Sequence, residues 1–119
     1  MPHECQRYET VGDWEWVDGV LTIRVSELSN WKREFLVAYH ELFEAMWCKS
    51  EGISQKDVDA FDQAFEDKRE PGNTDEPGDS PNAPYRHGHR IATVIEQLVA
   101  EELGENWANY DEEVCSLGE

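Results

Sequence analysis

The sequence predicts a small α+β domain in which an N-terminal β-hairpin, a small antiparallel sheet, packs on three helices. Three observations lead to this fold class. Two β-rich runs meet at Asp18-Gly19, three longer segments repeat apolar residues at helical spacing, and 119 residues are enough to enclose one hydrophobic core. We therefore expect residues 1–119 to form a single domain, with residues 10–110 as its ordered core.

The hairpin is predicted at residues 13–17 and 20–25. Asp-Gly is typical of a two-residue β-turn, because both central positions of that turn require residues that tolerate a positive φ. In the second run, Leu21, Ile23 and Val25 alternate with polar residues. One face of the hairpin should therefore be buried and the other exposed to solvent.

Three helices are predicted, at about 31–49, 54–69 and 86–103. Ser29 or Asn30 can cap the first helix, because their side chains accept hydrogen bonds from free backbone N–H groups. Ser54 begins a capping box in the second helix, and Gly104 can end the third in a left-handed conformation.

Apolar residues form a continuous arc on the first helix and another on the third, at about 3.6 residues per turn. On the first helix the arc comprises Phe35, Leu36, Tyr39, Leu42, Phe43 and Met46. On the third helix it comprises Ile91, Val94, Ile95, Leu98, Val99 and Leu103. These arcs are the surfaces through which the two helices are expected to pack.

Two further segments are expected to lie outside regular structure. Residues 70–84 contain four prolines and two glycines, which rules out a regular helix and predicts a loop. Residues 111–119 are acidic and should form a frayed tail, after Trp107 and Tyr110 have returned to the core.

The composition is strongly acidic, with 27 Asp and Glu against 10 Lys and Arg and a net charge of −17. Direct binding to nucleic acid is not expected, because contacts with phosphates require Lys and Arg. A basic host protein is an admissible partner. The charge disfavours self-association, although the oligomeric state stays open.

Three widely spaced cysteines without a CxxC pair fit a reducing cytosol. The N-terminus has no apolar signal region, and no apolar run reaches the roughly 18 residues of a membrane-spanning helix. We therefore expect a cytoplasmic protein that does not enter the membrane.

The HELFE run, residues 40–44, is the one motif of the chain that suggests a chemical function. His40 and Glu44 are four residues apart, so a helix places them on adjacent turns of one face, beside the apolar arc. His89 and Glu96 lie two turns apart, beside the arc of the third helix. If the helices pack through their arcs, these four side chains converge, and they suit zinc or another divalent transition metal. Glu41 could then accept a proton from water as the catalytic base.

A purely structural role is the alternative interpretation of the same residues. Histidine and glutamate at helical spacing occur by chance in acidic helices, so His40 could be a core-edge histidine bonded to a carboxylate. Glu96 could pair with a nearby Arg or Lys, and His87 competes with His89 as a ligand.

Residues 13–48, about a third of the chain, resemble the front half of a minimal zincin metallopeptidase, in which a strand borders the helix that carries H-E-x-x-H. The resemblance implies that His40 is the first zinc ligand and Glu41 the general base. Glu44 stands where that family has its second histidine. The third ligand would have to be His89 or Glu96.

The whole chain also resembles a group of small uncharacterised phage and prophage proteins. The shared features are GDW near the start, HELxEAxxC, GI…VDAFD, PGD…APY and H…A…IE…LG…W, and all of them occur here between Gly12 and Trp107. This resemblance implies a phage protein located in the host cytosol, and it implies no particular activity.

Together these observations predict a zincin-like, metal-binding phage protein that acts as a metal-dependent hydrolase through a His/Glu cluster on two helices. The alternative is a non-enzymatic acidic interaction protein, an inhibitor or nucleic-acid mimic that acts on a host protein. A third reading is an all-α nucleotide pyrophosphohydrolase, in which Glu41, Glu44 and Glu96 would hold magnesium. The predicted hairpin argues against this third reading.

Overall fold

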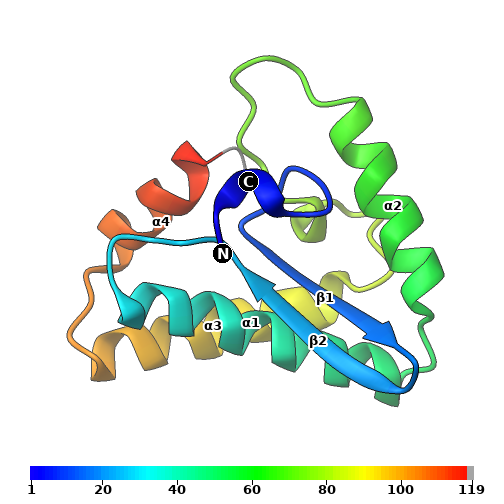
Figure 1. Ribbon diagram of the computed structural model, residues 1–119, viewed down its shortest axis with the longest axis horizontal. Coiled ribbons are helices and arrows are strands. Elements are labelled where there is room, and N and C mark those ends of the chain that lie inside the picture. Colours follow the sequence, from blue (N-terminus) through cyan, green and yellow to red (C-terminus); the bar gives the residue numbers. More distant parts are fainter. Residues whose placement is uncertain (118–119) are drawn as a thin grey trace.

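A two-stranded antiparallel sheet and four α-helices make up the computed structural model, which describes residues 1–117 (Figure 1). These elements are β1 Gly12–Val17, β2 Val20–Val25, α1 Trp31–Ser50, α2 Gln55–Asp67, α3 Arg86–Glu102 and α4 Trp107–Ser116. Two short 3-10 turns, η1 His3–Cys5 and η2 Pro77–Asp79, lie in the segments between them. The predicted α+β fold class is confirmed.

The hairpin forms where the Asp-Gly turn predicted it. Asp18 and Gly19 both adopt a positive φ, of 50° and 79°, as a two-residue hairpin turn requires. Trp14 pairs with Ile23 across the two strands, and Trp14 is buried against Ala45 of α1. The turn chemistry therefore sets the register, and packing on α1 sets which face is buried.

Helices α1 and α3 run antiparallel and form a two-helix layer (Figure 1). The side chain of Asn30 caps α1 by accepting a hydrogen bond from the backbone N–H of Arg33. Gly88 lets the helices approach closely, because a Cβ at this position would lie 2.5 Å from the ring of Trp47. The predicted first and third helices are thus confirmed and lie side by side.

The expectation that the two apolar arcs form the contact between these helices is wrong for half of their residues. Phe35, Leu42 and Met46 of α1 and Ile91, Val94 and Leu98 of α3 are exposed. The buried residues of α1 are Leu36, Val37, Glu44, Ala45 and Cys48. Those of α3 are Gly88, His89, Ala92, Glu96 and Ala100. The hairpin, α2 and α4 cover this smaller and more polar face of the layer, and the six exposed arc residues face solvent.

The C-terminal segment folds back as α4, which the sequence did not predict. Asn106 caps the helix by accepting from the N–H of Asn109, and Tyr110 and Val114 are buried against Leu36 and neighbouring core residues. The expectation of a frayed acidic tail is therefore wrong for residues 111–116. Residues 118 and 119 lie outside the described part of the chain.

The remaining segments follow the prediction closely. Helix α2 begins after the cap Ser54 and ends at Asp67, two residues earlier than expected. Residues 70–84 form a loop of turns that contains η2, and η2 contacts both α2 and α3. In the described residues, no helix is long and apolar enough to cross a membrane.

Candidate metal centre

A cavity of about 380 Å³ lies on the inner face of the α1–α3 layer, bounded also by the hairpin, α2, α4 and the loop around η2. Eleven carboxylates and two histidines line this cavity, and its described lining residues include no Lys or Arg. The histidines are His40 and His89, and Glu41, Glu44 and Glu96 also line it. The cavity therefore has a strong negative potential that attracts cations.

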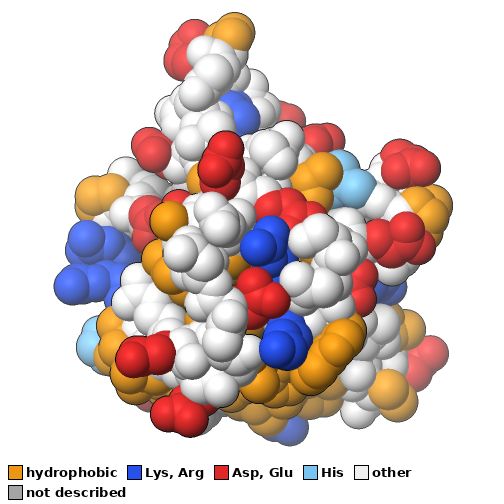
Figure 2. All heavy atoms as spheres, turned by 90° about the vertical axis from the view of Figure 1, so that its left-hand side faces the viewer, with side chains coloured by type: hydrophobic (Ala, Val, Ile, Leu, Met, Phe, Trp, Pro, Cys, Tyr) orange, Lys and Arg blue, Asp and Glu red, His pale blue; other side chains and the backbone are white. Residues whose placement is uncertain are grey.

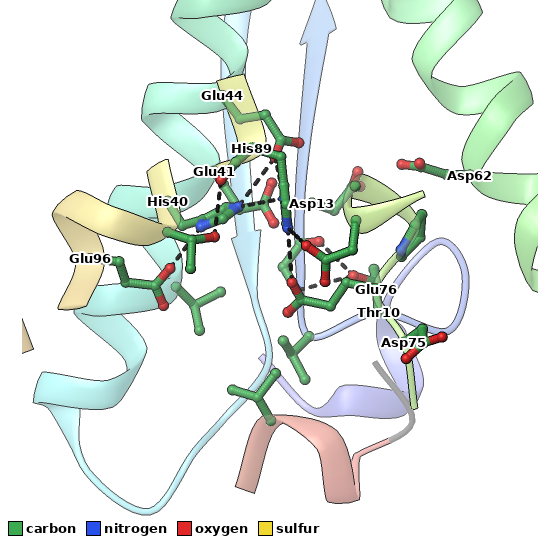
Figure 3. Close-up of a pocket in the computed structure, with 18 of the residues that line it drawn as sticks. Thr10, Asp13, His40, Glu41, Glu44, Asp62, Asp75, Glu76, His89 and Glu96 are labelled. Atoms are coloured by element: carbon green, nitrogen blue, oxygen red, sulfur yellow. Dashed lines mark hydrogen bonds and ion pairs between the residues drawn. The ribbon is translucent and has the colours of Figure 1, made fainter. Parts of the chain in front are cut away.

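Three ligand atoms meet at the centre of this cavity (Figure 3). Nε2 of His40 lies 3.1 Å from Nδ1 of His89, and Oε2 of Glu44 lies 3.2 Å from the first nitrogen and 3.1 Å from the second. In a tetrahedral zinc site with bonds of 2.0–2.1 Å, neighbouring ligand atoms lie about 3.3 Å apart. The triangle is thus close to the size that a metal ion requires.

Glu96 lies behind His40, outside the triangle. Its Oε1 is 2.7 Å from Nδ1 of His40, and its Oε2 accepts a hydrogen bond from the hydroxyl of Tyr110. A carboxylate at Nδ1 fixes the orientation of the ring and directs the electron pair of Nε2 into the cavity. The structure brings together all four predicted residues, with Glu96 on the opposite ring nitrogen from Glu44.

His89 has carboxylates on its far side as well. Nε2 of His89 lies 3.0 Å from Glu76 and 3.3 Å from Asp79, both in or beside η2. Neither oxygen has hydrogen-bond geometry, so this buried nitrogen has no hydrogen-bond partner among the described residues. Gly78 packs directly on the ring, since a Cβ there would lie 2.4 Å from it. The loop around η2 therefore closes the cavity over His89.

The second oxygen of Glu44 is also held in place. Trp14 of β1 donates a hydrogen bond from Nε1 to Oε1 of Glu44, at 3.3 Å. Oε2 is left facing the two histidines, which fixes it as the third corner of the triangle. The hairpin thus contributes to the site although it supplies no corner of the triangle.

The protonation of the three side chains in the triangle depends on their contacts with one another. Burial raises the pKa of Glu44, but its hydrogen bonds with His40 and His89 outweigh burial and lower this pKa to about 2. Burial lowers the pKa of His40, yet hydrogen bonds to Glu44 and Glu96 raise it well above its ordinary value. The facing nitrogens of His40 and His89 cannot both carry a proton, because two N–H groups would then point at each other across 3.1 Å. At most one proton can therefore lie between these two nitrogens.

Glu41, the predicted catalytic base, lines the same cavity. Its side chain lies against β1, where a Cβ at Gly12 would be 2.7 Å from Oε1 of Glu41. Glycine at position 12 therefore makes room for this carboxylate beside the strand. His87, which competed with His89 in the sequence, is exposed and its ring lies near Trp47 instead.

Asp62 is a further titratable residue of the cavity that the sequence analysis did not single out. The hydroxyls of Tyr8 and Tyr85 both donate hydrogen bonds to its carboxylate. Burial raises the pKa of Asp62 to about 7, and the negative charge of Glu44 adds to this effect. The sequence held one sign that Asp62 faces the interior. It lies four residues after the apolar Val58, and residues four apart share one face of a helix.

Comparisons with protein-family models, with curated proteins and with solved structures find no match to this chain. The resemblances to zincins and to phage proteins therefore stay predictions. Function has to be inferred from the chemistry and geometry of the cavity.

Proposed function

We propose that the protein binds one divalent transition metal ion, with zinc as the best-fitting candidate, and acts as a metal-dependent hydrolase. The ligands would be Nε2 of His40, Nδ1 of His89 and Oε2 of Glu44. The observation that carries this proposal is the triangle of 3.1–3.2 Å between these three atoms. Two histidines and one glutamate are a common ligand set of catalytic zinc sites, which keep a further position open.

The groups behind the histidines support a metal site over a structural role. A core-edge histidine needs one acceptor for its single N–H in the neutral form. Here carboxylate oxygens lie within 3.3 Å of both ring nitrogens of His40 and of His89. Carboxylates on the outer nitrogens of metal-bound histidines orient the rings and increase their basicity. Glu96 is proposed to serve in this way for His40.

The chain offers the groups that hydrolysis needs beside the proposed ion. A divalent ion here would supply Lewis acidity to a water molecule or to a substrate carbonyl. Glu41 is proposed to accept the proton of the attacking water. Asp62 is a second proton carrier in the same cavity, since a pKa of about 7 lets it exchange protons near neutral pH.

The charge of the cavity restricts the substrate class. Eleven carboxylates and the absence of Lys or Arg among its described lining residues repel phosphates and favour neutral or cationic substrates, such as peptides with free amines. This argues against the nucleotide pyrophosphohydrolase alternative. That alternative is further weakened because Glu44 and Glu96 lie at opposite nitrogens of His40 and do not form one carboxylate cluster.

Metal analysis of untagged protein tests the proposal. After reconstitution with zinc and extensive dialysis, we expect about one ion per chain for the wild type, and a large loss for Glu44→Gln and for His89→Gln. His87→Gln is the matched control, because it removes an exposed histidine two residues away on α3. A wild type that retains no stoichiometric zinc, iron or manganese, or an equal loss in the His87→Gln control, would overturn the proposal.

The alternative of an acidic interaction protein stays a prediction with its own test. Eleven of the 27 acidic side chains line the cavity, so the charge supports cation binding more directly than imitation of nucleic acid. Capture of a basic host protein at low salt, with equal strength by wild type and Glu44→Gln, would favour this alternative.

A further inference from the structure

The α1–α3 layer carries an exposed apolar surface on the side opposite the cavity. We call it the outer face and define it by Phe35, Leu42 and Met46 of α1 with Ile91, Val94 and Leu98 of α3. Each of these side chains is between 38% and 60% exposed. Figure 2 shows hydrophobic side chains gathered along the lower edge of the molecule, where Figure 1 places the two helices.

The outer face is large for a surface without a partner. Its six side chains leave on the order of 500 Å² of apolar area exposed, near the upper end for the largest patch of a monomer. Stable interfaces bury roughly 800 Å² per partner, with an apolar centre and a polar rim. The outer face has the extent of such a centre.

The net negative charge of the whole chain would oppose contact between two copies. The two helices that form the outer face carry little of this charge. Helices α1 and α3 contain five Lys or Arg and six Glu, a net charge of −1 out of −17. Three of the six, Glu41, Glu44 and Glu96, line the cavity on the opposite side of the layer. Repulsion between outer faces is therefore weak.

The exposed charged side chains of α3 have opposite signs at its two ends. Arg86 and Arg90 lie at its N-terminal end, and Glu101 and Glu102 at its C-terminal end. All four are exposed, and none forms an ion pair within the described residues. A two-fold axis through the middle of the outer face would bring the basic end of one copy to the acidic end of the other.

We propose that the outer face is the interface of a two-fold symmetric homodimer, in which the α3 helices of the two copies lie antiparallel. Self-complementarity of this kind is what a two-fold interface requires, because the same patch is used twice. The cavity lies on the far side of the layer, so both copies keep an open metal centre. This inference is independent of metal binding.

The molar mass in solution tests the dimer. By light scattering at micromolar concentrations, we expect the wild type to have twice the chain mass of 13.8 kDa, and Val94→Asp/Leu98→Asp to have 13.8 kDa. Val20→Asp is the matched control, since Val20 is equally exposed at the hairpin tip and outside the outer face. Circular dichroism would establish that the variants are folded.

A charge-reversal experiment tests the proposed orientation. Arg86→Glu/Arg90→Glu and Glu101→Arg/Glu102→Arg should each weaken self-association by tenfold or more, and an equimolar mixture of the two variants should restore a dimer of near wild-type affinity. A wild type of 13.8 kDa at every concentration, or a dimer that survives Val94→Asp/Leu98→Asp, would overturn the proposal. A mixture that stays dissociated would overturn the antiparallel arrangement of α3.

Discussion

Nε2 of His40 on α1 faces Nδ1 of His89 on α3 across 3.1 Å, inside a cavity rich in carboxylates. Two glycines allow this approach: Gly88 lets the helices pack closely, and Gly78 leaves room for the ring of His89. Glu96 then holds the far nitrogen of His40. Changes at the residues that position the two rings should alter metal binding in ways that can be told apart.

Glu96→Gln should weaken zinc binding by about 10- to 100-fold while leaving one site per chain, because the carboxylate orients His40 and raises its basicity. Competition with a zinc-chelating dye measures this affinity. Tyr110→Phe removes only the hydrogen bond to the outer oxygen of Glu96 and should cost less. Unchanged affinity in Glu96→Gln would contradict the orienting role, and complete loss of the site would identify Glu96 as a ligand.

Glu41→Gln should keep the fold and the metal but lower hydrolysis by about 10²- to 10⁴-fold, the usual contribution of a general base. The assay would use fluorogenic peptides with cationic residues, with phosphate esters as a comparison set. Glu102→Gln, an exposed change on α3, serves as the control. Activity retained in Glu41→Gln, against a substrate that the wild type cleaves, would exclude it as the base.

Asp62 should make the metal-free protein less stable as the pH rises. Its pKa is about 7 in the folded state against an ordinary value of 3.8, so between these values the folded state binds a proton that the unfolded state has lost. The free energy of unfolding should therefore fall by up to about 4 kcal/mol between pH 4 and pH 7, relative to Asp62→Asn. Urea unfolding of both proteins across this range measures the difference. A difference that does not change with pH would show that Asp62 is ionised throughout.

Gly78→Ala should destabilise the protein by about 1–3 kcal/mol and weaken metal binding, because its Cβ would overlap the ring of His89. Gly72→Ala in the same loop is the control. Its φ of 84° makes alanine unfavourable by about 1–2 kcal/mol, yet a Cβ there meets no neighbouring atom. Loss of metal affinity in both variants would point to loop stability in place of contact with His89.

The parts of the fold that local sequence specifies were predicted well. Asp18-Gly19 favours a tight turn in any context, and the caps Asn30 and Ser54 satisfy N–H groups within their own first turns. Helix α4 was missed because it is short and acidic. Burial of Tyr110 and Val114 against the core stabilises it, and local propensity does not.

In the candidate site, too, local sequence specifies some features and packing between elements decides the others. The sequence by itself determined the spacing of His40 and Glu44 on one helical face, and the presence of His89 and Glu96 on a second helix. Only the tertiary structure decided which face of each helix is buried, because this depends on where the hairpin, α2 and α4 pack. Periodicity identified the apolar arcs, but packing left half of their residues outside and enclosed the polar face with its two histidines. Residues distant in the chain, such as Asp62 and Glu76, joined the cavity for the same reason: their positions depend on contacts between elements, which no local pattern specifies.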